Sequence, residues 1–596
     1  MWSKPQASIH LRHMGPSCRP AVRVLGWATL AVALGCGTDP APHAAGGHAG
    51  STNTAAGSAG LSSGGGGATT GGSGGGGGVT DGGAGGSQAG MAGTATAGSS
   101  GSPAGPLFPH LIDGCDIPAA HERADRALAA LLVGFWNGAE QYLNSASPST
   151  GNSTGYWTYA QAFDALLDGV ERTGGERYRG LIRAFYDGRD QRGWLVDYYD
   201  DESWMTMTLL RAYDLTGDEL YLEQAKTIYT DIMAGWDTTC CGEHLGGIWW
   251  NKQHAQKATA SNAGPVIGGV RLAARSGDDQ YLTFARQVYD FWMEHMVDQA
   301  SFAIFDHFSP PDGARAPGSL TYNHGIMIGA ALELHAATGE QHFLDDAHGF
   351  GHYLATVPME DSEVGPVFND FGTNCDGDCP AWKGIGYRYM ALLFQQDPTR
   401  TEYRDVLVDG AEAIWTLARN PDTDHFSAYW MGPPPTAGGI EEQGSATMAL
   451  NLHAMLCGSD LSAAPVIAGR YEAEEARLEH VALEAQYAGY SGFGYVAAFA
   501  EDEQGVVFEV DAASSGMHQI SWTYAAAAGA ATRSVLVNGA LVSAAQSFAA
   551  TGAWDTWASV DTTLELAQGP NLVELRFDEA AGSVAPLNVD RIDVTN

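Results

Sequence analysis

Two adjacent aspartates, Asp200 and Asp201, stand in the stretch WLVDYYDDESWMTMTLLRAYDLTGDELYL (residues 194–222). Asp197 and Glu202 lie close by, and like charges this near to one another raise at least one pKa. A carboxyl group that keeps its proton beside one that is ionised is what cleavage of a glycosidic bond requires. The pair therefore predicts an acid and a nucleophile or base for sugar chemistry.

The same two residues also fit the start of a helix. Apolar side chains recur at helical spacing from Trp204 to Tyr213, and Gly217 follows as an end signal. An aspartate at a helix N-cap binds free N–H groups, and acids in the first turn complement the helix dipole. Taken alone, the stretch leaves capping and catalysis open, and the two roles are compatible.

The surrounding region, residues 107–461, reads as repeated helical hairpins. The phrases LTGDELYLEQAKTIYTDI (215–232), RSGDDQYLTFARQVYDFW (275–292) and ATGEQHFLDDAHGF (337–350) share one order of residues, and ERTGGERYRGLIRAFYD (171–187) resembles them. In each, a glycine serves as a left-handed helix end, an acid as the next N-cap and an aromatic residue as the first core residue. Recurrence at roughly 40–60 residues predicts stacked hairpins, either an α-solenoid or a closed toroid.

Long loops between these hairpins favour the toroid. The loop GGIWWNKQHAQKATASNAG (246–264) is rich in Trp, Asn and Lys. Flat aromatic faces and amide groups suit the binding of sugars. We therefore expect an all-α (α/α)6 toroid with a polar and aromatic site formed by its loops.

The last part of the chain, residues 466–596, has the pattern of an all-β module. Segments such as HQISWTYAAA, TRSVLVNGALV and NLVELRFDEA are short and separated by Gly and Asn turns. About 130 residues of such strands predict a β-sandwich with a jelly-roll-like form.

The first 36 residues read as an export signal. A basic region precedes the apolar run VLGWATLAVALG, which is too short to span a bilayer, and the run ends in ALGC. This ending resembles a bacterial lipobox, which would make Cys36 a lipidated residue on a membrane surface; a plain secreted protein cut nearby is the alternative. Residues 37–106, almost wholly Gly, Ala, Ser and Thr, predict a disordered tether.

Export makes disulfides permissible. Cys375 and Cys379 could close the small loop CDGDC, and Cys115 with Cys457 could join the two ends of one domain. The vicinal pair Cys240 and Cys241 has no clear place, and a zinc site built from cysteines lacks supporting His spacing.

The formal net charge of −39 argues against nucleic acid or an anionic membrane surface as a partner, because both would repel the chain. The chain is expected to meet a membrane only through a lipid anchor.

Four ordered motifs resemble glycoside hydrolase family 76, the endo-α-1,6-mannanases. They are YDDESWMTMTLLRAYDLTGDELYL, GGIWWNKQHAQKATASNAGPVIGGVRLA, LTYNHGIMIGAALEL and AWKGIGYRYM, in which Trp382 stands where the family has Phe. The resemblance covers roughly residues 107–461 and implies an (α/α)6 barrel and a retaining mechanism, with Asp200 as nucleophile and Asp201 as general acid/base. It implies no cofactor for catalysis. The substrate-binding candidates that it carries over are Trp249, Trp250, Asn262, Tyr322, Asn323 and Lys383.

The β module resembles carbohydrate-binding modules of families 6 and 35, through RYEAEEARL, GAWDTWASVDTTLELAQGPNLVELRF and NVDRIDV. The resemblance implies a structural Ca²⁺ held by Glu472, Glu474 and Asp590, carboxylates from both ends of the module. Trp554 and Asn588 are its candidate sugar contacts, and alternate acids on an exposed edge strand are the simpler interpretation of the glutamates.

The sequence thus predicts an exported bacterial enzyme, lipid-anchored at the cell surface or extracellular, that cuts α-1,6-linked mannan. Its expected partner is the polysaccharide α-mannan, and the protein is expected to be a monomer. Two alternatives stay open. One is another toroid enzyme, an unsaturated-uronide hydrolase or a sugar epimerase, in which a His or a single Asp would be central. The other is a surface protein that binds glycans without cleaving them.

Overall fold

The computed structural model describes residues 108–459 and 468–595. The predicted signal, Cys36 and the Gly-rich tether lie outside these residues. Within the two described ranges, none of the helices combines the length and apolarity needed to cross a bilayer.

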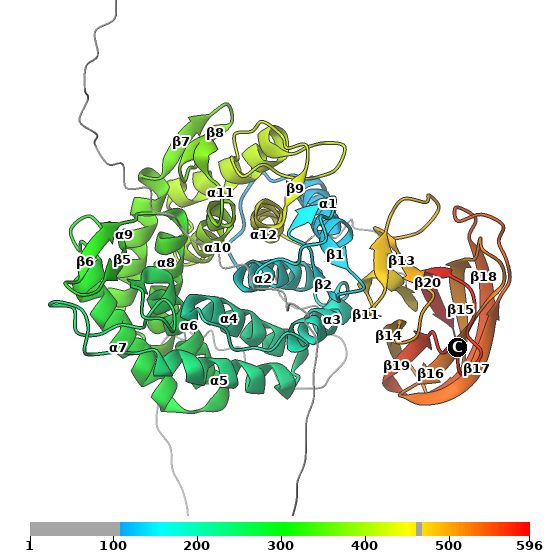
Figure 1. Cartoon of the computed structure of the whole chain (residues 1–596). Helices are drawn as coiled ribbons and strands as arrows, with labels where there is room; N and C mark the ends of the chain where they lie inside the picture. Colours follow the sequence, from blue (N-terminus) through cyan, green and yellow to red (C-terminus); the bar gives the residue numbers. More distant parts are fainter. Residues whose placement is uncertain (1–107, 460–467, 596) are drawn as a thin grey trace, which may run out of the picture. The chain divides into compact units, whose positions relative to one another are not determined.

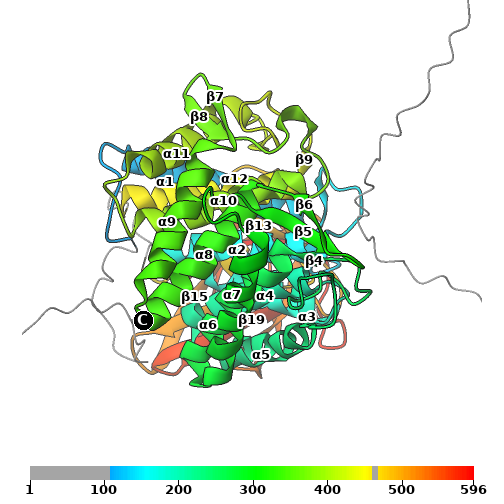
Figure 2. The same cartoon turned by 90° about the vertical axis from the view of Figure 1, so that its left-hand side faces the viewer.

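Residues 117–457 form a closed double ring of helices, which confirms the predicted (α/α)6 toroid (Figures 1 and 2). Each inner helix contacts the next one, and the last contacts the first, so the ring closes. The inner ring consists of α2 (Tyr156–Arg172), α4 (Tyr199–Thr216), α6 (Thr259–Ser276), α8 (Thr321–Thr338), α10 (Trp382–Phe394) and α12 (Ile440–Cys457). The outer ring consists of α1 (Ile117–Phe135), α3 (Arg179–Asp190), α5 (Glu219–Ala234), α7 (Asp279–Met296), α9 (Gln341–Thr356) and α11 (Thr401–Ala413).

Sequence pattern separates the two rings. Inner helix α4 is buried on nearly every side, whereas outer helix α7 buries one stripe that includes Tyr281, Val288 and Trp292. A helix buried all round belongs in a core, and one with a single apolar stripe belongs on its surface. The inner helices also pack closely: a Cβ on Gly325 of α8 would come within 2.9 Å of the Gly386 Cα of α10.

The repeated phrases mark the turns between paired helices, as predicted. Gly217 and Gly277 end α4 and α6 with φ of 72° and 71°, in the left-handed region that glycine enters without strain. Asp218 then caps α5 by accepting from the Leu220 N–H at 3.0 Å, and the first aromatic residue, Tyr221, is buried. Glu340, in the third phrase, stands at the N-cap of α9 without a side-chain capping bond.

Short strands decorate the loops of the toroid and were not predicted. The largest set is the antiparallel sheet β4 (Lys257–Ala258), β5 (Phe305–Ser309) and β6 (Ala314–Pro317). The others pair in twos: β1 (Trp136–Asn137) with β2 (Tyr142–Leu143), β3 (Ala146–Ser147) with β9 (Gly438–Gly439), and β7 (Met359–Ser362) with β8 (Gly365–Phe368).

Residues 470–595 form the predicted β-sandwich, with two antiparallel sheets. One sheet has the order β12 (Ala482–Glu484), β13 (Tyr495–Phe499), β20 (Leu587–Thr595), β15 (Gly516–Ala525) and β18 (Ala558–Leu566), and β10 (Arg470–Glu472) also pairs with β20. The other has the order β11 (Arg477–Glu479), β14 (Gly505–Ala512), β19 (Gly569–Arg576), β16 (Ala531–Val537) and β17 (Ala540–Phe548). Alternate side chains from both sheets, among them Phe508 and Trp522, fill the space between them.

Three disulfides join cysteines of the described residues. Cys115 pairs with Cys457 and Cys375 with Cys379, as expected, and the vicinal residues Cys240 and Cys241 pair with each other. The first of these joins the segment before α1 to the end of α12, at opposite ends of the helical domain in sequence.

Candidate active site

Asp200 and Asp201 occupy the first turn of inner helix α4, and neither serves as its cap. The N-cap position belongs to Tyr198, which makes no capping bond through its side chain. Asp200 Oδ1 accepts from the neighbouring Asp201 N–H, at 3.1 Å. The capping interpretation of the pair is therefore wrong. The first turn of α4 carries the two carboxyl groups, but neither of them caps the helix.

The loop before α6 supplies a second donor to Asp200. Trp250 Nε1 donates to Asp200 Oδ2 at 2.9 Å, and its ring lies 4.8 Å from that of Tyr198. The Trp250 carbonyl accepts from the Tyr199 N–H at 2.9 Å, which ties this loop to the start of α4. Both oxygens of Asp200 are thus hydrogen-bonded, and these bonds favour its anionic form.

The electrostatic surroundings of Asp200 and Asp201 shift their two pKa values to different extents. Burial raises the pKa of Asp200 to about 7, while the bonds from Trp250 and the Asp201 N–H act against that rise. Burial, the charge of Asp200 and the charges of Asp378 and Glu202 together raise the pKa of Asp201 well above its usual value. The two shifts favour Asp200 as the carboxyl group that ionises first and Asp201 as the one that keeps its proton longer.

Glu202 completes the first turn of α4 and is tied into the scaffold. Its Oε1 accepts from the Val196 N–H at 2.9 Å and from Lys252 Nζ at 3.1 Å. Lys252 also pairs with Asp231 of α5 at 2.6 Å. Glu202 is fully buried, so its role is to fix the turn that carries the pair.

Tyr322 and Asn323, in the first turn of α8, share one carboxylate partner that the sequence did not single out. Asp306 Oδ1, on β5, accepts from Tyr322 Oη and from Asn323 Nδ2, both at 2.9 Å. His307 Nδ1 lies 2.8 Å from the other oxygen. The charge of Asp200 acts on Tyr322, which places this hub beside the pair. Asp306 comes from a loop strand, and no helical pattern in the sequence marks it.

Asn262 and Trp249 have positions that differ from the sugar contacts expected of them. Asn262 is fully buried; its Oδ1 accepts from the Ile248 N–H at 2.7 Å and its Nδ2 donates to the Ala258 carbonyl at 2.8 Å. Trp249 is also buried, with its ring between His254 and Lys257. Both residues hold the loop that presents Trp250, because every polar atom of the Asn262 amide is used within it.

Lys383, in the first turn of α10, is fully buried behind the site. Burial lowers the pKa of its ammonium group, and the charges of Asp370 and Glu442 oppose that shift. Its Nζ lies 3.6 Å from Cys375 Sγ, at the base of the CDGDC loop. Lys383 therefore supports this loop from beneath.

Two further carboxyl groups belong to the site and were missed. Asp378 of the CDGDC loop accepts from Trp157 Nε1 at 3.1 Å, and its charge acts on Asp200, Asp201 and Glu441. Burial raises the pKa of Glu441, at the start of α12, to about 7. The shared signal is position: each stands at or just before the start of an inner helix, where the first turns of the ring converge.

The sandwich places its predicted calcium residues together. Ser491 bridges two of them, since its Oγ donates to Glu472 Oε2 at 2.6 Å and its N–H to Asp590 Oδ1 at 2.8 Å. Glu474 Oε1 accepts from the Phe493 N–H at 2.9 Å, and its Oε2 is buried without a partner among the described residues. Arg591 also contacts Asp590. The three carboxylates lie around one loop and Glu474 keeps an unpartnered buried oxygen, and the calcium site stays a prediction.

The two predicted sugar contacts of the sandwich differ in exposure. Trp554 is half-buried in the loop between β17 and β18, whereas Asn588 is buried on β20. Neighbouring Trp557 is held by a bond from its Nε1 to the Ala488 carbonyl at 3.1 Å and by contact with Tyr495.

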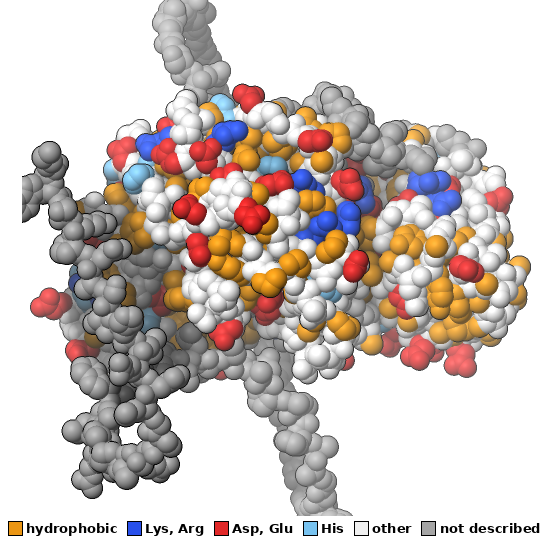
Figure 3. All heavy atoms as spheres, turned by 90° about the horizontal axis from the view of Figure 1, so that it is seen from above, with side chains coloured by type: hydrophobic (Ala, Val, Ile, Leu, Met, Phe, Trp, Pro, Cys, Tyr) orange, Lys and Arg blue, Asp and Glu red, His pale blue; other side chains and the backbone are white. Residues whose placement is uncertain are grey.

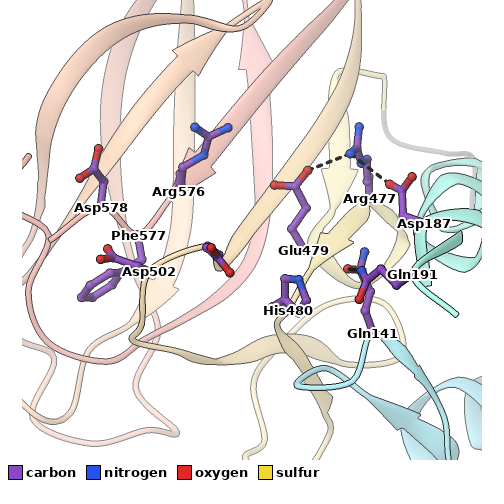
Figure 4. A pocket seen from close by; sticks show the side chains of 11 residues that line it. Gln141, Asp187, Gln191, Arg477, Glu479, His480, Asp502, Arg576, Phe577 and Asp578 are labelled. Atoms are coloured by element: carbon purple, nitrogen blue, oxygen red, sulfur yellow. Dashed lines mark hydrogen bonds and ion pairs between the residues drawn. The ribbon is translucent and has the colours of Figure 1, made fainter. Parts of the chain in front are cut away.

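A cavity elsewhere holds none of the predicted site residues (Figure 4). Figure 4 shows Arg477 between Asp187 and Glu479, each 3.1 Å from it. Its charge is thereby balanced within the cavity wall. On the face shown in Figure 3, acidic side chains are spread widely and basic ones lie in a few groups.

Both domains of the chain are similar to known carbohydrate-active proteins. Residues 469–595 match the sequence profile of carbohydrate-binding module family 35. Mannan endo-1,6-alpha-mannosidase DFG5 of Saccharomyces cerevisiae is 26% identical over 293 residues, which cover 43% of this chain and 61% of the yeast protein's length.

Solved structures of alpha-1,6-mannanases are similar to the helical part of this chain. The GH76A alpha-1,6-mannanase of Salegentibacter sp. HEL1_6 superposes with a TM-score of 0.52 at 28% identity, covering 56% of this chain and 99% of that one. A second structure of that enzyme, 27% identical over 56% of this chain and 99% of its own with the same TM-score, is an inactive variant with two adjacent aspartates replaced by asparagine, in complex with alpha-1,6-mannotriose. Residues 120–464, well over half of the chain, match the profile of glycosyl hydrolase family 76, and the chain belongs to this family.

Proposed function

We propose that the protein is a retaining glycoside hydrolase that cleaves α-1,6-mannosidic bonds within mannan backbones. The observation that carries the proposal is the pair Asp200 and Asp201 in the first turn of α4, within a family 76 toroid. The solved relative in complex with alpha-1,6-mannotriose, inactive when two adjacent aspartates are replaced, supports the substrate and the pair.

In this proposal Asp200 is the nucleophile and Asp201 the general acid/base. Asp200 ionises first and its anion accepts two N–H donors, so it attacks C1 of the mannosyl unit and forms a covalent intermediate. Asp201 retains its proton and gives it to the departing O6. It then takes a proton from the water that attacks C1, and Asp200 leaves as a carboxylate.

Tyr322 and Trp250 are the substrate contacts that the arrangement favours among the predicted ones. Trp250 has an aromatic face next to the nucleophile, and Asp306 fixes the orientation of the Tyr322 hydroxyl. Asn323 and Lys383 act from behind, through Asp306 and the CDGDC loop.

The sandwich is proposed to bind carbohydrate, with Trp554 and Asn588 as contacts and Glu472, Glu474 and Asp590 as ligands of a structural Ca²⁺. A bound cation would neutralise three crowded carboxylates and join the first and last strands of the sandwich, β10 and β20. We further propose that the protein is exported, is held at the cell surface through Cys36 or released outside the cell, and acts as a monomer on a polysaccharide.

The test is to incubate the full chain with unbranched α-1,6-mannan and to follow product size and anomeric configuration. We expect internal cuts and products that first appear in the α configuration. Asp200→Ala should lower the rate by at least about 10³-fold while binding through the sandwich persists. Products of inverted configuration would overturn the assigned nucleophile, and absence of any product would overturn the activity.

A further inference from the structure

The CDGDC loop carries an exposed carboxylate to the catalytic pair. Asp378 lies immediately before Cys379 in the segment that leads into α10, and its side chain is exposed. It is nevertheless close enough to Asp200 and Asp201 for its charge to raise the pKa of both. An exposed group beside half-buried catalytic groups is one that an arriving substrate must meet.

A hydrogen bond across the ring fixes this carboxylate. Trp157 Nε1, in the first turn of α2, donates to Asp378 Oδ1 at 3.1 Å. Its neighbour Tyr156 donates from its hydroxyl group to the Trp194 carbonyl at 2.9 Å, in the segment that leads into α4, and the charges of Asp201 and Glu202 act on it. The bond from Trp157 therefore orients one oxygen of Asp378 and presents an indole ring next to it.

The base of the CDGDC loop is also held in place. Cys375 and Cys379 are joined by a disulfide, so the loop is a closed ring of the chain. Cys379 Sγ lies 3.4 Å from the Asp370 carbonyl, and Asp370 Oδ1 accepts from the Thr321 N–H at 3.0 Å, at the start of α8. With Lys383 beside Cys375, the loop is held to the starts of both α8 and α10.

The second oxygen of Asp378, Oδ2, makes no hydrogen bond to any of the described residues. An ionised carboxylate only accepts hydrogen bonds, and sugar hydroxyls are donors that it binds strongly. An oriented carboxylate next to a tryptophan ring is a common composition for a sugar-binding position.

We propose that Asp378 is a substrate-binding residue, whose free oxygen accepts hydrogen bonds from hydroxyls of a mannosyl unit next to the scissile bond. Trp157 and the Cys375–Cys379 disulfide are its positioning elements. This inference rests on the proposed mannanase activity and adds a contact that none of the predicted substrate residues supplies.

The test compares two aspartates of one loop. Asp378→Ala should raise KM for a defined α-1,6-mannooligosaccharide about 10-fold or more, because a charge-assisted bond to substrate is lost. Asp376→Ala, an exposed neighbour within the same disulfide ring with no side-chain bond among the described residues, should keep the wild-type KM. Trp157→Phe, which keeps a ring but loses the N–H donor, should raise KM by a smaller factor.

Direct measurement of binding distinguishes a contact between Asp378 and the substrate from an effect of Asp378 on the catalytic step. In an Asp200→Asn/Asp201→Asn background, calorimetry with α-1,6-mannotriose should show Asp378→Ala weakened by a similar factor and Asp376→Ala unchanged. The contribution of the sandwich is common to all variants and cancels. Equal affinity and equal KM for the Asp378 and Asp376 variants would overturn the inference, as would a loss confined to kcat. Asp378→Asn, which keeps the side-chain volume, replaces the alanine variant if the latter fails to fold.

The disulfide gives an independent arm. Cys375→Ser/Cys379→Ser should raise KM while the melting temperature of the sandwich is unchanged, because only the support of Asp378 is removed. A wild-type chain that releases no sugar from α-1,6-mannan would overturn the proposed activity and this inference with it. A wild-type chain that is active, with an unaltered Asp378→Ala variant, would overturn the inference alone.

Discussion

Asp200 and Asp201 are neighbours in sequence but differ in their hydrogen bonds. Asp200 accepts from Trp250 Nε1 and from the Asp201 N–H, whereas burial and the neighbouring negative charges raise the pKa of Asp201, with the charge of Arg189 opposing that rise. Donors lower the pKa of a carboxyl group, and nearby anions raise it. This asymmetry supports one residue as nucleophile and the other as acid, a distinction that adjacency alone does not make.

The dependence of kcat/KM on pH should reflect this difference between Asp200 and Asp201. The proposed mechanism needs Asp200 ionised and Asp201 protonated, so kcat/KM should be bell-shaped, with its acid limb near the raised pKa of about 7 for Asp200. Below that pH the nucleophile takes up a proton and the rate falls; at higher pH the acid loses its proton and the rate falls again. The two limbs describe the pair as a unit, since its members titrate together.

Trp250→Phe is the matched variant. It keeps an aromatic ring but removes the donor that stabilises the Asp200 anion, so the acid limb should move to higher pH, by about 1 unit. A pH–rate profile of both proteins checks this. An acid limb that stays in place, or moves to lower pH, would contradict the assigned role of the indole N–H.

Residue types alone could single out the candidate pair, with capping and catalysis both open, but not all of its neighbours. The DD motif and the aromatic loop are continuous stretches of sequence. Residues within such a stretch stay close together in the fold, so their types can be interpreted together. Asp306 and Asp378 reach the site through tertiary structure, from a loop strand and a disulfide ring; the start of α10 just after Asp378 is a local signal, whereas no helical pattern marks Asp306. Asn262 shows the converse: its amide suits a sugar, but the loop around it uses every bond that the amide can make.

At the scale of elements, an ion network joins three inner helices. Arg388 of α10 donates to both oxygens of Asp168 on α2, at 2.8 and 2.6 Å, and Arg211 of α4 donates to Asp168 Oδ1 at 2.8 Å. Asp168 is fully buried. Asp164 also pairs with both arginines, so removing Asp168 leaves two buried cations to share the remaining carboxylates.

Asp168→Ala should therefore lower the free energy of unfolding of the helical domain by about 3–5 kcal/mol. Glu171 contacts the same Arg211 at 2.9 Å, but its side chain is 37% exposed, so Glu171→Ala should cost no more than about 1 kcal/mol. Chemical denaturation of both variants measures the difference. Similar losses for the two would show that the network contributes little to holding the helices together.

The order of elements was largely predictable, because the Gly, acid and aromatic phrases encode each turn between helices locally. Gly217 and Asp218 behave as their types require. The short strands of the toroid loops were not predicted, since each is only two to five residues long; β5 pairs with the nearby β6 and with the distant β4. The sandwich strands alternate clearly, and their turns are rich in Gly and Asn.

At the scale of the whole molecule, the sandwich should depend on calcium for stability. Addition of EDTA should lower its melting temperature by several degrees, and Ca²⁺ should restore it, because Glu472, Glu474 and Asp590 repel one another without a cation. Calorimetry of the full chain, with the helical domain's transition as an internal control, tests this. Glu474→Gln should abolish the response to Ca²⁺; a response that survives would place the ion elsewhere.

The disulfide between Cys115 and Cys457 has a mechanical consequence. Its two sulfurs join positions 342 residues apart, with Cα atoms separated by 5.4 Å, at the two ends of the helical domain. A pull between the segment before Cys115 and the sandwich after Cys457 would pass through this one covalent bridge. The toroid would bear no load, and its catalytic turns would keep their geometry under tension.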